Sequence, residues 1–300
     1  MILQTKSPIA EIPMPPVAIG IALFSFFCFS LLDASAKWLV VGGQAVFFVV
    51  WVRFAIQALF LLLFFKGWEN PKLWKMERPV LQVCRGLLLP AMTCFNFLAL
   101  QYLQLAETIS VLLASPIVVA VLAGPMLGEW AGPRRWVAIF VGFIGVLIVV
   151  RPGTDVFSWP VLLIIGSMLC NSFYLVLTRK LASVETPESL IFYSCFFGVL
   201  IFAPLGIPEA QMPQQMSDWF AFALAGMAGM VGHMGLIKAS KLADAAKVTP
   251  FIYTQIIWMT LLGFLIFGDL PDGWTVLGMM VVAGSGLYLW YREHKLRKRA

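Results

Sequence analysis

Ionisable side chains inside long apolar runs are the residues of this 300-residue chain that are best able to do chemistry. They are Asp33, Lys37, Arg53, Arg85 and His233. A charge in hydrocarbon is costly, so such residues usually contact a substrate, an ion or another charge. Asp33 and Lys37 are four residues apart and share one helix face, and we expect Arg53, on the next run, to be able to meet them. The cluster is either a substrate-facing or gating group, or a structural charge cluster that fixes helix packing.

The third and eighth runs carry polar groups at matching positions. Asn96 precedes Glu107 by eleven residues, and His233 precedes Asp244 by the same number. This register predicts that both side chains line a cavity, although His233 could instead be hydrogen-bonded in the core, or could couple transport to protons. Arg85 lies near the start of its run. It either binds an anion in a cavity open to the cytoplasm or extends its guanidinium to the lipid headgroups.

Uncharged polar side chains within the runs should point into a helix bundle, because facing lipid is unfavourable for them. Of these, the residues expected to bind or gate a substrate are Gln57, Asn171, Tyr174, Tyr253 and Gln255, together with Trp258. Pro250 frees a backbone carbonyl just before Tyr253, as Pro116 does in the fourth run. The deep indole of Trp258 could stack on a flat substrate.

The elements that position these residues are transmembrane helices. The chain is 61% hydrophobic and 12% charged, whereas soluble domains carry roughly 25% charged residues. Continuous apolar runs, without alternation, predict helices of about 20 residues rather than β-strands. We expect an all-α integral membrane protein of ten spans, at 17–40, 45–65, 79–101, 105–127, 133–150, 159–180, 187–206, 217–238, 245–268 and 272–291.

The basic residues fall mainly on one side of these spans. With the N-terminus taken as cytoplasmic, 17 Lys and Arg residues lie inside and two, Lys37 and Arg151, lie outside. Because cytoplasmic loops are enriched in Lys and Arg, both termini are predicted to be cytoplasmic and the membrane to be a bacterial inner membrane. Segment 1–16 would be a cytoplasmic N-terminal segment and 292–300 a basic cytoplasmic tail. The net charge of +6 therefore reflects topology, and no nucleic-acid binding is expected.

The two halves of the chain repeat each other in sequence. Leu105-Ala106-Glu107 matches Leu242-Ala243-Asp244, and Pro116 with Trp136 matches Pro250 with Trp274. These correspondences predict two five-helix repeats, at 17–152 and 159–291. An odd number of helices inverts the second copy, and inverted repeats are typical of transporters with a site between the halves near the midplane.

Several residues resemble the EamA-type family of the drug/metabolite transporter superfamily. The most specific stretch runs from Tyr102 through Pro116 and Gly128-Glu129 to Arg151-Pro152-Gly153. Asp33 to Trp38, Arg53-Phe54 and Arg85-Gly86 are also similar to members of that family. Asp269 stands where the family often has Glu. The resemblance covers about Pro16 to Trp290 and implies ten helices, inverted repeats, a central cavity and alternating access.

We therefore expect a secondary transporter of a small polar or aromatic metabolite, riboflavin-like or aromatic amino-acid-like. Exporters or exchangers of S-adenosylmethionine, amino acids or drugs from the same family, and a non-transporting membrane scaffold, remain alternatives. No catalytic constellation, P-loop or Cys/His cluster is visible, so we expect no enzyme, no cofactor and no metal site. The expected partners are a small-molecule substrate and the lipid bilayer, with a monomer as the functional unit and a dimer as the alternative.

Overall fold

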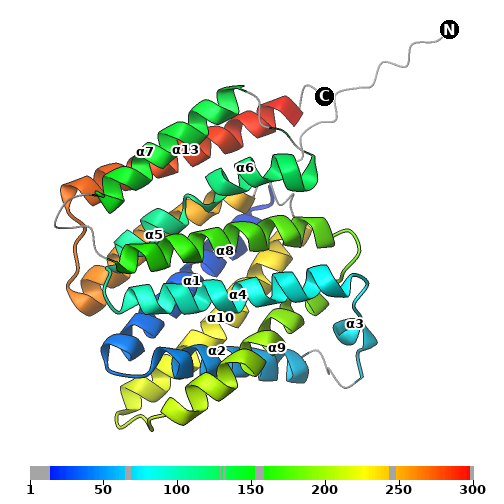
Figure 1. Cartoon of the computed structure of the whole chain (residues 1–300), viewed down its shortest axis with the longest axis vertical. Helices are drawn as coiled ribbons and strands as arrows, with labels where there is room; N and C mark the ends of the chain where they lie inside the picture. The colour runs from blue at the N-terminus through cyan, green and yellow to red at the C-terminus, as the bar shows by residue number, and fades with distance from the viewer. Residues whose placement is uncertain are drawn as a thin grey trace.

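The chain folds into a bundle of long helices, as seen in a computed structural model (Figure 1). The structure describes residues 14–64, 69–128, 130, 133–152, 159–242 and 248–297. All regular elements in these ranges are helical. The predicted segment 1–16 lies outside them apart from its last three residues, as do Asp244, Glu129 and residues 298–300 of the predicted tail. The rest of that tail continues the last helix as far as Arg297.

Proline begins many of the helices, because at the first helical position its missing N–H costs nothing and its fixed φ suits a helix. The helices of the first half are α1 (Pro16–Val41), α2 (Val46–Phe64), α3 (Pro71–Trp74), α4 (Pro79–Leu100), α5 (Leu105–Leu112), α6 (Ser115–Leu127) and α7 (Pro133–Val150). Those of the second half are α8 (Pro160–Leu181), α9 (Pro187–Gly206), η1 (Ile207–Glu209), α10 (Met216–Leu242), η2 (Thr249–Thr254), α12 (Gln255–Leu262), η3 (Gly263–Phe267) and α13 (Gly273–Arg297).

Eight helical segments of the described residues are long and apolar enough to cross a membrane. They correspond to the first four and the sixth to ninth of the predicted spans. The fifth and tenth predicted spans contain shorter apolar helices, Trp136–Val150 and Gly273–Tyr288. The prediction of an all-α protein built for a membrane is thus confirmed for the described residues.

Two of the spans are interrupted at the prolines singled out in the sequence. The fourth span divides into α5 and α6 at Leu113 and Ala114, directly before Pro116. The ninth begins as the 3₁₀ helix η2, with Pro250 in its first turn, continues as α12 and ends in the π-helical turn η3. At membrane depth, non-helical backbone is tolerated where it is buried in protein or lines a water-filled cavity, and local 3₁₀ and π turns can satisfy backbone groups that a proline frees.

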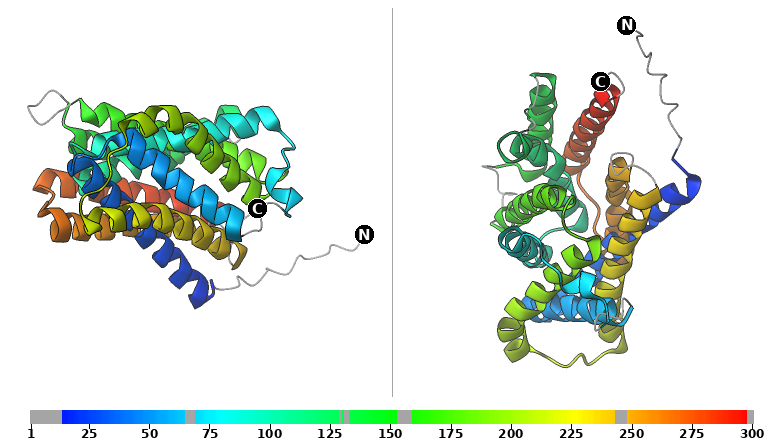
Figure 2. Two further views of the ribbon diagram at one scale, coloured as in Figure 1. Left: turned by 90° about the horizontal axis from the view of Figure 1, so that it is seen from below. Right: turned by 90° about the vertical axis from the view of Figure 1, so that its right-hand side faces the viewer.

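Helices of the two halves pack in pairs. α1 packs along α10 and α8 along α4, while α2 packs on α9 and α7 on α13. The α7–α13 pair forms one end of the molecule and the α2–α9 pair the other, as Figure 1 and the right view of Figure 2 show. The helices α1, α4, α8 and α10 lie between these ends and surround the most buried side chains.

Candidate functional site

A polar stripe runs along one face of α4 through the middle of the bundle. Gln82, Arg85, Thr93 and Asn96 lie within less than a quarter turn of one another around the helix, and all four are buried. Polar side chains on a buried face need hydrogen-bond partners. Those partners come from both halves of the chain, so α4 joins five of the predicted site residues: Asp33, Arg53, Arg85, Asn96 and Tyr174.

Asp33 of α1 meets this stripe at Asn96. The Nδ2 of Asn96 donates to Oδ1 of Asp33 at 3.0 Å, and both side chains are buried. The remaining Oδ1 of Asn96 is buried without a partner. The sequence predicted both residues as site residues, and the structure places them in direct contact.

Arg53 of α2 meets the stripe one turn away, at Thr93. Its Nη1 donates to Oγ1 of Thr93 at 2.5 Å, and its guanidinium lies 4.9 Å from the ring centre of Phe54 and 5.6 Å from that of Phe97. The Nε of Arg53 is buried without a partner.

The expected three-residue cluster of Asp33, Lys37 and Arg53 is not joined by direct ion pairs among the described residues. The reason is that Asn96 and Thr93 of α4 bind Asp33 and Arg53 separately. Lys37, one turn beyond Asp33, instead forms a 2.6 Å ion pair with Asp269. Its ammonium also lies 4.8 Å from the ring centre of Phe267.

Arg85 is enclosed by neutral groups of the second half. Its Nε donates to Thr178 at 2.9 Å, its Nη2 to the Tyr174 hydroxyl at 2.7 Å, and its Nη1 to Ser194 at 3.0 Å and to the carbonyl of Leu190. The guanidinium also lies 4.4 Å from the ring centre of Tyr174. It is 2% exposed, so it does not extend to the headgroups, contrary to one of the two interpretations.

Gln57 links α2 to both α9 and α10. Its Oε1 accepts from the Cys195 thiol at 3.6 Å, a long contact, and its Nε2 has no partner. The Nε2 lies against Gly229 of α10, where any side chain would collide with it. The small residue therefore leaves room for the amide of Gln57, which is 1% exposed.

The predicted residues of the second half are more dispersed. His233 of α10 and Trp258 of α12 both pack edge-on against phenylalanines of α1. The ring centres of His233 and Phe29 are 4.9 Å apart, and those of Trp258 and Phe27 are 5.1 Å apart. Asn171 donates to Ser115 at the α5–α6 break at 3.1 Å.

The other two residues of this set lie at the ninth span. Gln255 is buried, and the Tyr253 hydroxyl is buried next to Gly286 without a hydrogen-bond partner.

Thr93 and Asp269 contact the predicted residues but were not among them. A lone Thr in an apolar helix usually hydrogen-bonds a backbone carbonyl of the preceding turn. Thr93 does so, since its hydroxyl donates to the Leu89 carbonyl at 2.9 Å. Its register with Arg85 and Asn96 is the signal that marks it. No local pattern could pair Asp269 with Lys37, because they are 232 residues apart.

Contacts between the halves also join the tips of the long helices on both sides of the bundle. On the side of Lys37, near the C-terminus of α1, Arg151 forms a 2.6 Å ion pair with Asp272. Hydrogen bonds from Thr275, together with Arg151, hold the pKa of Asp272 below its usual range. At the other end, the Oε1 of Glu185 accepts the backbone N–H groups of residues 77 and 78 at 2.9 Å each.

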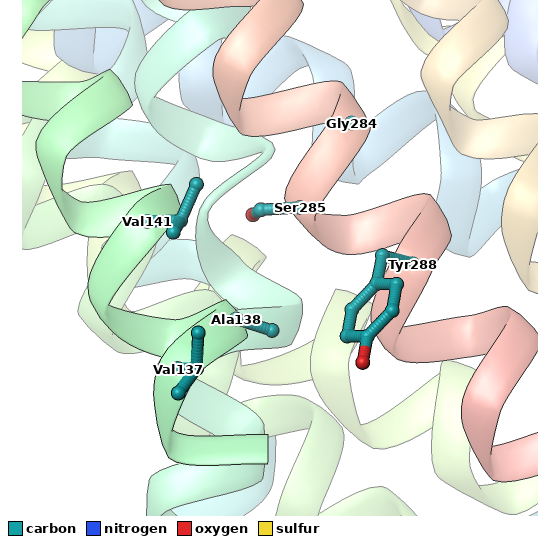
Figure 3. Close-up of a pocket in the computed structure, with 6 residues that line it drawn as sticks. All are labelled: Val137, Ala138, Val141, Gly284, Ser285 and Tyr288. Atoms are coloured by element: carbon teal, nitrogen blue, oxygen red, sulfur yellow. The ribbon is translucent and has the colours of Figure 1, made fainter. Parts of the chain in front are cut away.

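Two surface cavities lie away from this site. One, of about 290 Å³, is lined by Val137, Ala138, Val141, Gly284, Ser285 and Tyr288 between α7 and α13 (Figure 3). The other, of about 460 Å³, lies against α12 and the start of α13. None of the predicted site residues lines either cavity, and both linings are largely apolar.

Comparison with known proteins gives full-length and partial relatives. The chain is 30% identical over 193 residues to a riboflavin transporter of Vibrio cholerae, covering 64% of this chain and 65% of that protein. It is 28% identical over 275 residues to an S-adenosylmethionine uptake transporter of Rickettsia prowazekii, covering 91% and 92%. A solved crystal structure aligns with a TM-score of 0.62 at 19% identity over 90% of this chain and 94% of the other, which shows a shared fold.

The sequence model of the EamA-like transporter family matches the chain twice, at residues 16–151 and 158–291. The two matches include all of the candidate site residues described above. Together with the candidate spans, they make the chain a multi-pass membrane protein. The chain belongs to the EamA-like transporter family.

Proposed function

We propose that this protein is a secondary transporter, rather than an enzyme, that moves a small polar or aromatic metabolite across a bacterial inner membrane by alternating access. The observation that carries the proposal is the group of buried polar atoms without partners on α2 and α4. Arg53 Nε, Gln57 Nε2 and Asn96 Oδ1 belong to side chains that are at most 7% exposed. Unpaired buried groups are costly, and a bound substrate would satisfy them.

The proposed architecture is ten transmembrane helices in two inverted five-helix repeats, 17–152 and 159–291. The double family match supports a duplication. In this architecture α1 corresponds to α8, α2 to α9, α4 to α10 and α7 to α13. Under this exchange the α1–α10 contact becomes the α8–α4 contact, and the α2–α9 and α7–α13 contacts are unchanged, so the packing has the symmetry that a duplication predicts. Rocking of one repeat against the other around the α4 stripe would expose the site to each side in turn.

The proposed topology has both termini in the cytoplasm, which places Lys37, Arg151 and their partners at the outer end of the bundle. The excess of Lys and Arg in the loops on the side of the termini supports it. The proposed unit is a monomer in the lipid bilayer, with a dimer as the alternative.

The proposed cargo contains a flat heterocycle. The relatives named above transport riboflavin in one case and take up S-adenosylmethionine in the other, and both compounds carry a flat aromatic ring system. The indole N–H groups of Trp51 and Trp258 are buried without partners, so these rings offer both stacking surfaces and donors. Riboflavin is the first candidate. S-adenosylmethionine is the second, because its transporter matches almost the whole chain.

Reconstituted vesicles test the proposal directly. Purified protein in proteoliposomes should take up or exchange radiolabelled riboflavin or S-adenosylmethionine, and Asn96→Leu should reduce the flux because the substitution removes both the contact to Asp33 and the free acceptor. The matched control is Leu98→Met on the same helix, outside the polar stripe. Absence of flux for any compound of a broad metabolite panel, with folded protein, would favour a non-transporting scaffold.

A further inference from the structure

The buried charges on α1, α2 and α4 do not balance. Arg53 and Arg85 are 4% and 2% exposed, and Asp33, at 8%, is the one buried carboxylate within the described spans. Lys37 adds nothing to the difference, because Asp269 neutralises it. The described part of the bundle interior therefore carries one more positive than negative charge.

Arg85 has hydrogen bonds but no counter-charge. All of its partners are neutral hydroxyl or carbonyl groups, and no carboxylate of the described residues lies within 4 Å of its guanidinium. Glu185, in the loop between α8 and α9, uses its Oε1 for the backbone N–H groups of residues 77 and 78. A buried charge without a partner is unfavourable unless an opposite charge can reach it.

Arg53 has the open donor that such an opposite charge needs. Its Nη1 is used by Thr93, whereas its Nε is buried and unpaired. The planar guanidinium matches the geometry of a carboxylate or a phosphate, and hydrogen bonds between charged groups are stronger than those between neutral ones. Arg85 donates to Ser194 of α9, and the next residue of that helix, Cys195, contacts Gln57, one turn from Arg53 on α2, so both guanidinium groups lie beside α9.

We propose that the cargo carries an anionic group, a carboxylate or a phosphate, which binds the free Nε edge of Arg53 while Arg85 supplies a second positive charge nearby. The inference rests on the proposed transport function and changes the order of its candidate cargoes: riboflavin is neutral, so riboflavin 5′-phosphate is placed ahead of it, and S-adenosylmethionine fits only through its carboxylate. It favours a phosphorylated or carboxylated aromatic compound over a neutral one. It also disfavours a cationic cargo, since a cation would add to the excess positive charge.

Ligands that share a ring system and differ in their charged substituent test this inference. Riboflavin and riboflavin 5′-phosphate share one ring system, and benzoate and benzylamine form a smaller anion–cation pair. Binding to purified protein in detergent would be measured by thermal shift and by flavin fluorescence. We expect the anionic member of each pair to bind about tenfold more tightly, because a hydrogen bond between charged groups contributes at least this factor.

Substitutions of Arg53, compared with a substitution of another arginine, test whether Arg53 causes the preference for the anionic ligand. Arg53→Gln should abolish the preference for the anion, and Arg53→Lys should keep its sign with weaker binding, because the charge remains and the guanidinium fork is lost. Arg78→Gln is the matched control, since Arg78 is exposed at the start of α4 and keeps its backbone contact. If Arg53→Gln does not fold, the wild-type preference together with Arg53→Lys decides the question.

The outcomes separate this inference from the transport proposal. Equal or tighter binding of the neutral or cationic members, or no binding of any anionic probe, would overturn the inference even if the vesicles transport a metabolite. Arg53-dependent anion binding by a protein that transports nothing would support an anion site at Arg53 and reject the transport function. Binding of benzoate without either flavin would support it and remove flavins as the cargo.

Discussion

Breaking the ion pair between Lys37 and Asp269 should open the outer end of the bundle. The pair joins α1 of the first half to the turn before α13 of the second, with the Lys37 side chain 9% and the Asp269 side chain 26% exposed. Removing one partner of a buried pair costs about 3–5 kcal/mol, whereas exposed pairs contribute about 0–1 kcal/mol. We place this partly buried pair at about 2 kcal/mol, which shifts the population toward the outward-open state by about 30-fold.

The native Cys195 provides the readout for this shift. It is 1% exposed and lies at the centre of the bundle against Gln57. In a variant with the other four cysteines replaced, a membrane-impermeant thiol reagent would be added to vesicles from the outer side. Lys37→Met should raise the rate of Cys195 modification by about 30-fold, in proportion to the open population.

Two further variants control the experiment. Arg151→Met breaks the more exposed pair with Asp272, whose side chains are 20% and 47% exposed, so we expect less than about a fivefold increase. The double exchange Lys37→Asp with Asp269→Lys should return the rate toward that of the parent. An unchanged rate in folded Lys37→Met would refute the role of this ion pair in closing the outer end.

Three other predictions concern stability in detergent. Gly278→Ala should lower the free energy of unfolding by about 1–3 kcal/mol, because the new methyl group would overlap Val149 on α7. Gly284→Ala is the control, since a methyl group there meets nothing within 4 Å and should change the free energy little, and thermal denaturation compares the two variants. Glu185→Gln should cost about 1 kcal/mol by the same measurement, since two backbone N–H groups lose a charged acceptor. The pKa of Asp272 lies below its ordinary value of 3.8, so its carboxylate stabilises the fold above pH 3.8, and this stabilisation is lost as the pH falls through the lowered pKa. Asp272→Asn should therefore slightly flatten the decrease of the free energy of unfolding at acid pH. An unchanged acid dependence would contradict this.

The helices could be predicted closely from the sequence because their signals are local. Pro79, Pro160 and Pro187 begin helices within one residue of the predicted starts, and Pro116 marks the α5–α6 break. In hydrocarbon a segment can satisfy its backbone hydrogen bonds within itself only as a helix, so a continuous apolar run is a strong helix signal. The count of ten spans was less secure, because the fifth and tenth runs form shorter apolar helices.

The composition of the site could be predicted, but its pairings could not. Buried ionisable residues were identified by type alone, and Asp33, Arg53, Arg85 and Asn96 are all buried around α4. Which atoms meet depends on the packing of helices that are distant in sequence. Asp33 and Lys37 share one face of α1 as expected, yet one turn of helix is enough to send them to different partners.

The ion pair between Lys37 of α1 and Asp269 has a consequence for synthesis. Asp33 can meet Asn96 soon after it enters the membrane, but Lys37 is separated from Asp269 by 232 residues. At a synthesis rate of about 5–20 residues per second, the ammonium of Lys37 stays without its carboxylate for roughly 10–50 seconds. The Lys37–Asp269 pair can therefore join α1 to the second half only after residue 269 has been synthesised.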